Sequence, residues 1–127
     1  MKEKFIEVEF TVWQFVRIMV DLEGRRANRP AYEAWQEAWK ELDRKLERNR
    51  QKDVEAFSDL MMNKEVIVDA NLAQVQDAAE AAGRVIRALG KALVRVDSHR
   101  ERDNLLFEQG ELEELRSRLV VIASGMS

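Results

Sequence analysis

The chain has 127 residues, of which 46% are hydrophobic and 35% are charged, and its formal net charge is −3. This length predicts a single domain, 1–127, with a sizeable buried core, and the composition is too apolar for a disordered chain. The chain contains no cysteine, which excludes disulfides and zinc–thiolate sites, and its negative charge argues against bulk nucleic-acid binding. We expect a soluble, cytoplasmic protein, because no segment reaches the roughly 20 apolar residues of a membrane span.

The first predicted element is a strand over residues 4–10, in which apolar and acidic side chains alternate. Thr11 is a good N-cap for the helix that follows, and Pro30 begins a second helix. In that second helix large apolar residues recur at helical spacing and form a seam. The members of the seam are Tyr32, Trp35, Trp39, Leu42 and Leu46. We expect a break near Asn49, where polar residues interrupt the seam, and then a shorter helix.

The second half of the chain begins with another short strand, over residues 66–68. Asp69 follows this strand and is the expected N-cap of a third helix. This long helix has the most regular apolar pattern in the chain. Its predicted seam consists of Leu72, Val75, Ala79, Ala82, Ile86, Leu89, Leu93 and Val96. Ser98 is the expected N-cap of a fourth helix, which continues to about residue 123.

These elements predict a mainly α fold, a helical bundle of two long helical hairpins with two short β-strands in the order β-α-α-β-α-α. The order suggests a two-fold internal repeat over residues 4–62 and 65–123. The alternative is that any helical domain with two short strands shows such a pattern. The strands could pair with each other within one chain or across a dimer axis.

A basic stripe is the first candidate site, because its cations follow one face of the third predicted helix without an acidic residue among them. If the third and fourth helices form a hairpin, further basic residues gather at the same end. The set is Arg84, Arg87, Lys91, Arg95, His99, Arg100 and Arg102. Such a stripe could bind an acidic partner helix or a phosphate backbone. The alternative is a solvated face with cations near a helix C-terminus, where the helix dipole favours them.

Three aromatic residues, Tyr32, Trp35 and Trp39, are the second candidate site. Aromatic residues at helical spacing usually belong to the core. The alternative is an interface, since Trp and Tyr carry much of the energy of protein–protein contacts. Because extended helical seams favour self-association and dimers are the commonest oligomers, a homodimer is the expected assembly.

Enzymatic chemistry has weaker support. His99 could act as a general base oriented by Asp103, but it lies in a polar helix start that is typical of a solvated residue. Asp77 and Glu80 form a helix-borne acidic pair of the kind that binds magnesium in all-α nucleotide hydrolases. The predicted seam turns both carboxylates away from the core, whereas metal ligands in a bundle converge inward. A longer acidic series on the fourth helix comprises Glu108, Glu111 and Glu114.

We therefore expect a small non-enzymatic protein that acts in protein–protein interaction or regulation and self-associates through its helices. Another protein is a further candidate partner. The first alternative is an anion- or nucleic-acid-binding protein that uses the basic stripe. The second is a metal-dependent all-α nucleotide hydrolase. No cofactor, metal site or membrane contact is expected.

Overall fold

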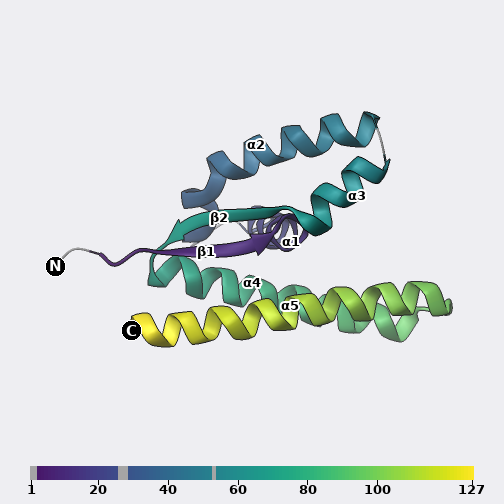
Figure 1. The fold of residues 1–127 in the computed structure, drawn as a ribbon. Coiled ribbons are helices and arrows are strands. Elements are labelled where there is room, and N and C mark those ends of the chain that lie inside the picture. The colour runs from purple at the N-terminus through teal and green to yellow at the C-terminus, as the bar shows by residue number, and fades with distance from the viewer. Residues whose placement is uncertain (1–2, 26–28, 53) are drawn as a thin grey trace.

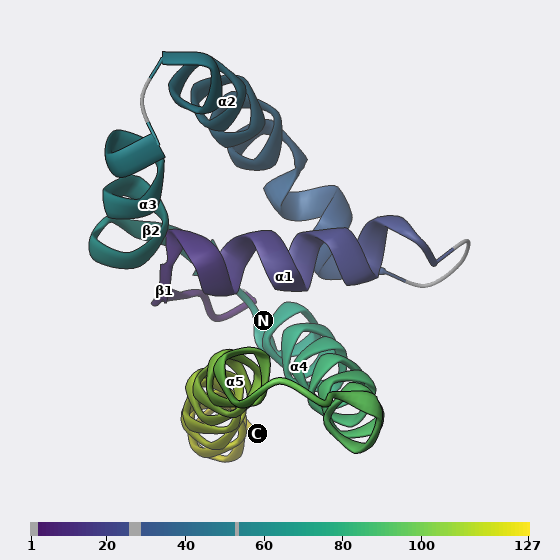
Figure 2. The same cartoon turned by 90° about the vertical axis from the view of Figure 1, so that its right-hand side faces the viewer.

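The computed structural model describes residues 3–25, 29–52 and 54–127. Within these residues a two-stranded ribbon and α1 lie between α2 and α3 on one side and the hairpin of α4 and α5 on the other (Figure 1 and Figure 2). The elements are β1 (Ile6–Thr11), α1 (Val12–Glu23), α2 (Pro30–Lys52), α3 (Val54–Asn63), β2 (Glu65–Ala70), α4 (Leu72–Arg95) and α5 (His99–Met126). None of the described helices combines the length and the apolar character that crossing a membrane requires.

The predicted fold class is confirmed, since the structure is mainly helical and contains the two expected short strands. The fourth predicted helix does fold back along the third, so that α4 and α5 form a long hairpin (Figure 1). Between the two strands the described chain contains three helices, α1, α2 and α3. The sequence predicted two helices there, the second followed by a shorter helix after a break.

The two strands pair with each other, antiparallel and within the chain. Their register is symmetric about Val8 and Val68, which face each other, and Ile6 pairs with Ala70 as Phe10 pairs with Val66. Apolar residues on one side of the ribbon are buried, whereas its acidic residues, Glu7, Glu9, Glu65 and Asp69, are exposed. The alternation that predicted a half-buried strand is therefore confirmed for β1. The internal repeat over residues 4–62 and 65–123 stays a prediction.

Each strand runs directly into a capped helix. Thr11 accepts a hydrogen bond from the backbone of Gln14, whose side chain accepts one from the backbone of Thr11. Asn71 and Gln74 form the same reciprocal capping box at the start of α4. The prediction that Asp69 caps α4 was wrong, because the strand continues through Ala70 and leaves the carboxylate of Asp69 on the exposed side of the ribbon.

The helix break expected near Asn49 was also placed wrongly. Helix α2 continues past Asn49 to Lys52, and α3 begins at Val54; residue 53 lies outside the described residues. Lysine, arginine and glutamine are good helix formers, so a loss of apolar spacing does not end a helix. An ion pair between Glu47 and Arg50, with N and O atoms 4.0 Å apart, links neighbouring turns at this point.

Aromatic side chains pack against one another in the part of the core between β1, α1 and α2. The Phe10 ring lies 5.7 Å from that of Phe15 and 5.6 Å from that of Trp35, measured between centroids, and the Phe15 and Trp39 centroids are 6.4 Å apart. These residues connect β1, α1 and α2. The indole N–H of Trp35 also donates a hydrogen bond to the carbonyl oxygen of Asp69 in β2, 3.1 Å away. A buried aromatic group of this kind contributes both apolar burial and a preferred ring geometry.

The buried face of α4 is rotated relative to the predicted seam. Val75, Ala82 and Leu89 are buried as expected, but Ile86 and Leu93 are only half-buried, while Ala78, Ala81 and Val85 are buried instead. The cause is contact with α1 and α2 in addition to α5, which turns the helix toward its small residues. This rotation decides where the polar side chains of α4 lie.

Candidate binding surfaces

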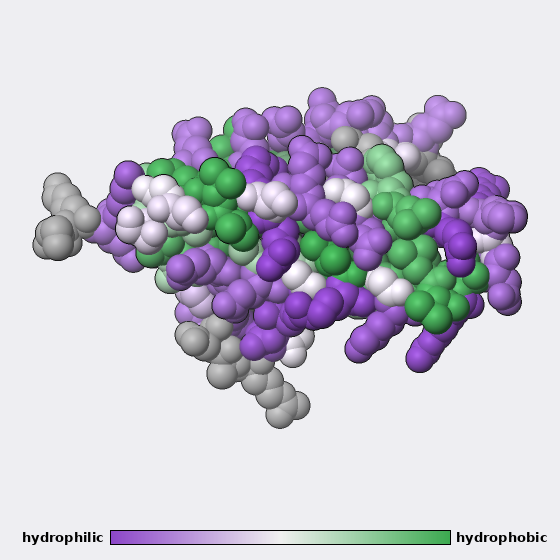
Figure 3. Space-filling view, turned by 90° about the horizontal axis from the view of Figure 1, so that it is seen from below, coloured by the Kyte–Doolittle hydropathy of each residue, from purple (hydrophilic) through white to green (hydrophobic). Residues whose placement is uncertain are grey.

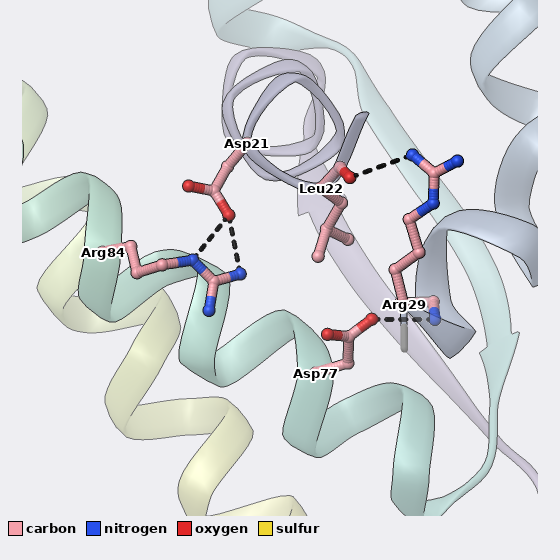
Figure 4. A network of polar contacts seen from close by, with 6 residues as sticks. Asp21, Leu22, Arg29, Asp77 and Arg84 are labelled. Atoms are coloured by element: carbon pink, nitrogen blue, oxygen red, sulfur yellow. Dashed lines mark hydrogen bonds and ion pairs between the residues drawn. The ribbon is translucent and has the colours of Figure 1, made fainter. Parts of the chain in front are cut away.

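The first residue of the predicted basic stripe, Arg84, is bound within the protein. Its guanidinium donates two hydrogen bonds to the Oδ2 atom of Asp21 in α1, at 2.9 Å from Nε and 2.7 Å from Nη2 (Figure 4). Both side chains are mostly buried, with exposed fractions of 23% and 20%. Arg84 therefore joins α4 to α1 and has its charge neutralised by Asp21.

The rest of the stripe is on the surface. Arg87, Lys91 and Arg95 are exposed along α4, and His99, Arg100 and Arg102 are exposed in the first turn of α5, at the end of the hairpin. None of these six side chains forms an ion pair with a described residue. The hairpin thus brings together the two groups of cations that the sequence analysis assigned to one end.

A further arginine, Arg116 of α5, joins the stripe at Gly83. A Cβ atom built on Gly83 would lie 3.4 Å from Nε of Arg116 and 3.7 Å from Nη1 of Arg87. Gly83 is consequently buried beneath two arginine side chains from different helices. Arg116 was not among the predicted residues of the stripe, since only the register between α4 and α5 shows that it faces Arg87.

Two grooves flank this arginine pair along the α4–α5 hairpin. The larger, of about 710 Å³, has a mixed lining from both helices that includes Glu80, Ser124 and Ser127 beside the arginines. The smaller, of about 450 Å³, contains Glu113 and Ser117. Arg87 and Arg116 line both grooves, so their guanidinium groups form the ridge between them.

The acidic pair Asp77 and Glu80 is split by the rotation of α4. Glu80 is exposed, but Asp77 is buried, which corrects the expectation that both carboxylates face outward. Oδ2 of Asp77 accepts a hydrogen bond from the backbone N–H of Ala31 at 3.0 Å, so it caps the first turn of α2 from another helix (Figure 4). Burial raises the pKa of Asp77, against the opposing effects of the Ala31 hydrogen bond and the positive charge of Arg84.

Other candidate catalytic or metal-binding groups do not come together. Among residues 3–25, 29–52 and 54–127 no group of three or more histidine and acidic side chains could hold a metal ion. The side chains of His99 and Asp103 are both exposed, and no hydrogen bond or ion pair joins them in the described part of the chain.

The aromatic candidates mostly lie inside the protein. Trp35 and Trp39 have exposed fractions of 3% and 9% and belong to the core. In this conformation they offer no surface to a partner. Tyr32 is half-buried at the start of α2, where the guanidinium of Arg29 lies 4.4 Å from its ring centroid. The part of the Tyr32 ring that is not buried therefore interacts with the neighbouring cation, Arg29.

Large apolar side chains are nevertheless exposed, and four of the eight among the described residues are on α5. Leu106 and Phe107 lie near its start, and Val120 and Val121 near its end, with exposed fractions between 45% and 71%. The space-filling view of the α4–α5 side shows apolar areas toward both ends of the hairpin, with polar surface between them (Figure 3). Val94, on the last turn of α4, is the most exposed of the large apolar residues at 85%.

No family model, curated protein or solved structure matches this chain.

Proposed function

We propose that this chain is a non-enzymatic, cytoplasmic interaction or regulatory protein that self-associates through α5. The observation that supports the proposal is that α5 exposes more large apolar residues than it buries. Of its 28 residues only Leu112, Leu115 and Leu119 are fully buried, while four large apolar residues are exposed. Scattered exposed apolar residues are normal on protein surfaces. Their concentration on one long helix that packs mainly against α4 is typical of a helix with a missing partner.

The outward face of α5 is also self-complementary. Leu106, Gly110, Ser117 and Val121 are all exposed and follow one another at helical spacing on the side opposite the buried leucines. A second α5 laid antiparallel about a two-fold axis would place Leu106 against Val121 of the partner subunit and Gly110 against the partner's Ser117. The small residues allow the helices to approach, and the apolar ones at both ends supply the contact. This symmetry favours a second copy of the chain as the occupant.

Glu113 and Glu114 would lie near the axis of such a dimer, and both are exposed. Their mutual repulsion opposes association, and salt screens it. The proposed dimer should therefore become tighter as the salt concentration rises, which is the opposite of binding to a polyanion.

The test is the mass of the protein in solution, by native mass spectrometry and by light scattering at low and high salt. We expect a dimer, favoured by salt, for the native sequence and a monomer for the double variant Leu106→Glu/Val121→Glu. Ala34→Glu adds one negative charge, against two in the double variant, to an exposed site on α2, on the other side of the molecule, and should leave the dimer intact. A native chain that stays at 14.8 kDa up to high micromolar concentration would contradict the proposal.

A further inference from the structure

The arginine pair above Gly83 brings two like charges together from different helices. Arg87 and Arg116 converge on the same point of the α4 backbone, at 3.7 Å and 3.4 Å from the position of a Gly83 Cβ. Both side chains are exposed, so water weakens the repulsion between their charges, and an anion bound by both would cancel it.

No described carboxylate neutralises the pair. Glu80 and Glu113 line the two flanking grooves, yet neither lies within the 4.0 Å of an ion pair with Arg87 or Arg116. Arg84, one turn away on α4, shows the contrasting case, since both of its hydrogen bonds go to Asp21. The donors of Arg87 and Arg116 are thus free to bind a ligand from outside the described chain.

The grooves give such a ligand space and further donors. The larger groove, of about 710 Å³, is open to solvent along the hairpin and carries the hydroxyl group of Ser124, whereas the hydroxyl of Ser127 already donates to the carbonyl oxygen of Ser124. The smaller groove adds the hydroxyl of Ser117. Two guanidinium groups with neighbouring hydroxyl donors suit an anion that has two charges and several oxygen atoms.

We propose that Arg87 and Arg116 bind the dianionic phosphate group of a phosphate monoester, whose remaining part lies in the larger groove. The three terminal oxygens of such a group can accept hydrogen bonds from both guanidinium groups at once, and its charge cancels their repulsion. A carboxylate can accept hydrogen bonds from both guanidinium groups, but its single charge neutralises only one of their two charges. Ser117 and Glu113 border both this site and the proposed contact between two copies, whereas Arg87 and Arg116 belong to the phosphate site alone, so the two proposals are tested by different variants.

The first experiment is isothermal titration calorimetry with inorganic phosphate at constant ionic strength. The native protein should bind phosphate, and Arg87→Gln/Arg116→Gln should lower the affinity at least tenfold. Lys91→Gln/Arg95→Gln removes the same charge from exposed positions farther along the stripe and should bind as the native chain does. Absence of phosphate binding by the native protein, or an equal loss in the control, would overturn the proposal.

Three additional readouts separate binding from folding and identify the source of the phosphate. Arg87→Gln/Arg116→Gln should keep the native helical circular dichroism, because it removes a repulsion rather than a bond, but its melting temperature should no longer rise with phosphate. Glu80→Gln, which removes a negative charge from the larger groove, should bind phosphate more tightly. Tighter binding of a phosphoserine peptide than of a nucleoside monophosphate would assign the phosphate to a modified protein, and the reverse order to a small metabolite.

Discussion

Asn71, and not Asp69, determines where α4 begins, although both residues are good N-caps in isolation. The side chain of Asn71 accepts the backbone N–H of Gln74, whereas the carboxylate of Asp69 points to solvent from β2. We predict that Asn71→Ala lowers the free energy of unfolding by about 0.5–2 kcal/mol, the usual cost of losing a cap.

The matched control for this prediction is Asp69→Ala, which removes an equally good capping side chain from the exposed side of a strand. Its effect should stay within about 0.5 kcal/mol. Urea denaturation followed by circular dichroism measures both values. A larger loss in Asp69→Ala than in Asn71→Ala would show that the helix starts at the earlier residue.

At the same scale, Asp77 links the stability of the fold to pH. Burial raises its pKa above the ordinary value of 3.8, so the folded protein holds this proton more tightly than the unfolded chain does. The resulting contribution to stability is fully present at pH values below the ordinary pKa and is lost as the pH rises through the raised one.

We predict that Asp77→Asn removes this part of the pH dependence. The amide oxygen of asparagine can still accept the Ala31 N–H, while the cost of burying a charge disappears. Denaturation curves at several pH values should show the native chain losing stability relative to Asp77→Asn as the pH rises from about 3.8. A difference that shrinks over this range would contradict the sign of the shift.

Asp77→Ala provides the comparison for the hydrogen bond itself. It leaves the buried N–H of Ala31 without its acceptor, and should cost about 1–3 kcal/mol relative to Asp77→Asn at every pH, because neither variant titrates at this position. The amide variant and the alanine variant thereby separate the charge of Asp77 from its role as a cap.

At the level of the helices, the α4–α5 hairpin explains two glycines that are unfavourable for a helix. Long side chains of α5, and not its backbone, cover these positions. Arg116 covers Gly83, and the side chain of Gln109 lies over Gly90 and donates a hydrogen bond to the carbonyl oxygen of Ile86. The packing between the two helices therefore includes polar side chains across the helix backbone.

Gly110 has no such neighbour, because a Cβ atom built there meets nothing within 4 Å. We predict that Gly110→Ala raises the free energy of unfolding by about 1 kcal/mol through helix propensity alone. The comparison should be made in the Leu106→Glu/Val121→Glu background, so that self-association does not contribute to stability.

The control for Gly110→Ala is Gly90→Ala, where the new methyl group would lie 3.5 Å from Nε2 of Gln109. At that distance the methyl group is in ordinary van der Waals contact, so the hydrogen bond of Gln109 with Ile86 is kept. Thermal unfolding should therefore show about the same stabilisation at position 90 as at position 110. A clearly smaller gain at position 90 would mean that the methyl group disturbs the Gln109 contact.

For the molecule as a whole, local patterns predicted the elements and missed the contacts between them. Alternation showed the strand near Val8, and helical spacing identified Trp35 and Trp39 as members of one seam. Neither pattern contains the orientation of one helix on another, so the burial of Asp77 and the approach of Arg116 to Arg87 were not visible. Both depend on residues far away in the sequence.

The same limit explains the two errors in placing element boundaries. Asp69 is a good cap by residue type, but pairing with Glu7 across the ribbon keeps it in a strand. The apolar seam fades near Asn49, but helix propensity and the neighbouring ion pair carry α2 further. In both cases the local pattern described the residues correctly, but a neighbouring interaction outweighed it and determined where the element ends.

The pairing of β1 with β2 also has a consequence for synthesis on the ribosome. Because Ile6 pairs with Ala70, the first strand has no partner until the chain has emerged as far as Ala70. During that interval its backbone edge is open to other nascent chains, the usual route to aggregation. Glu7 and Glu9 are exposed to water in the folded ribbon and place negative charge on the unpaired strand. They therefore act as gatekeeper residues against aggregation while the protein is being made.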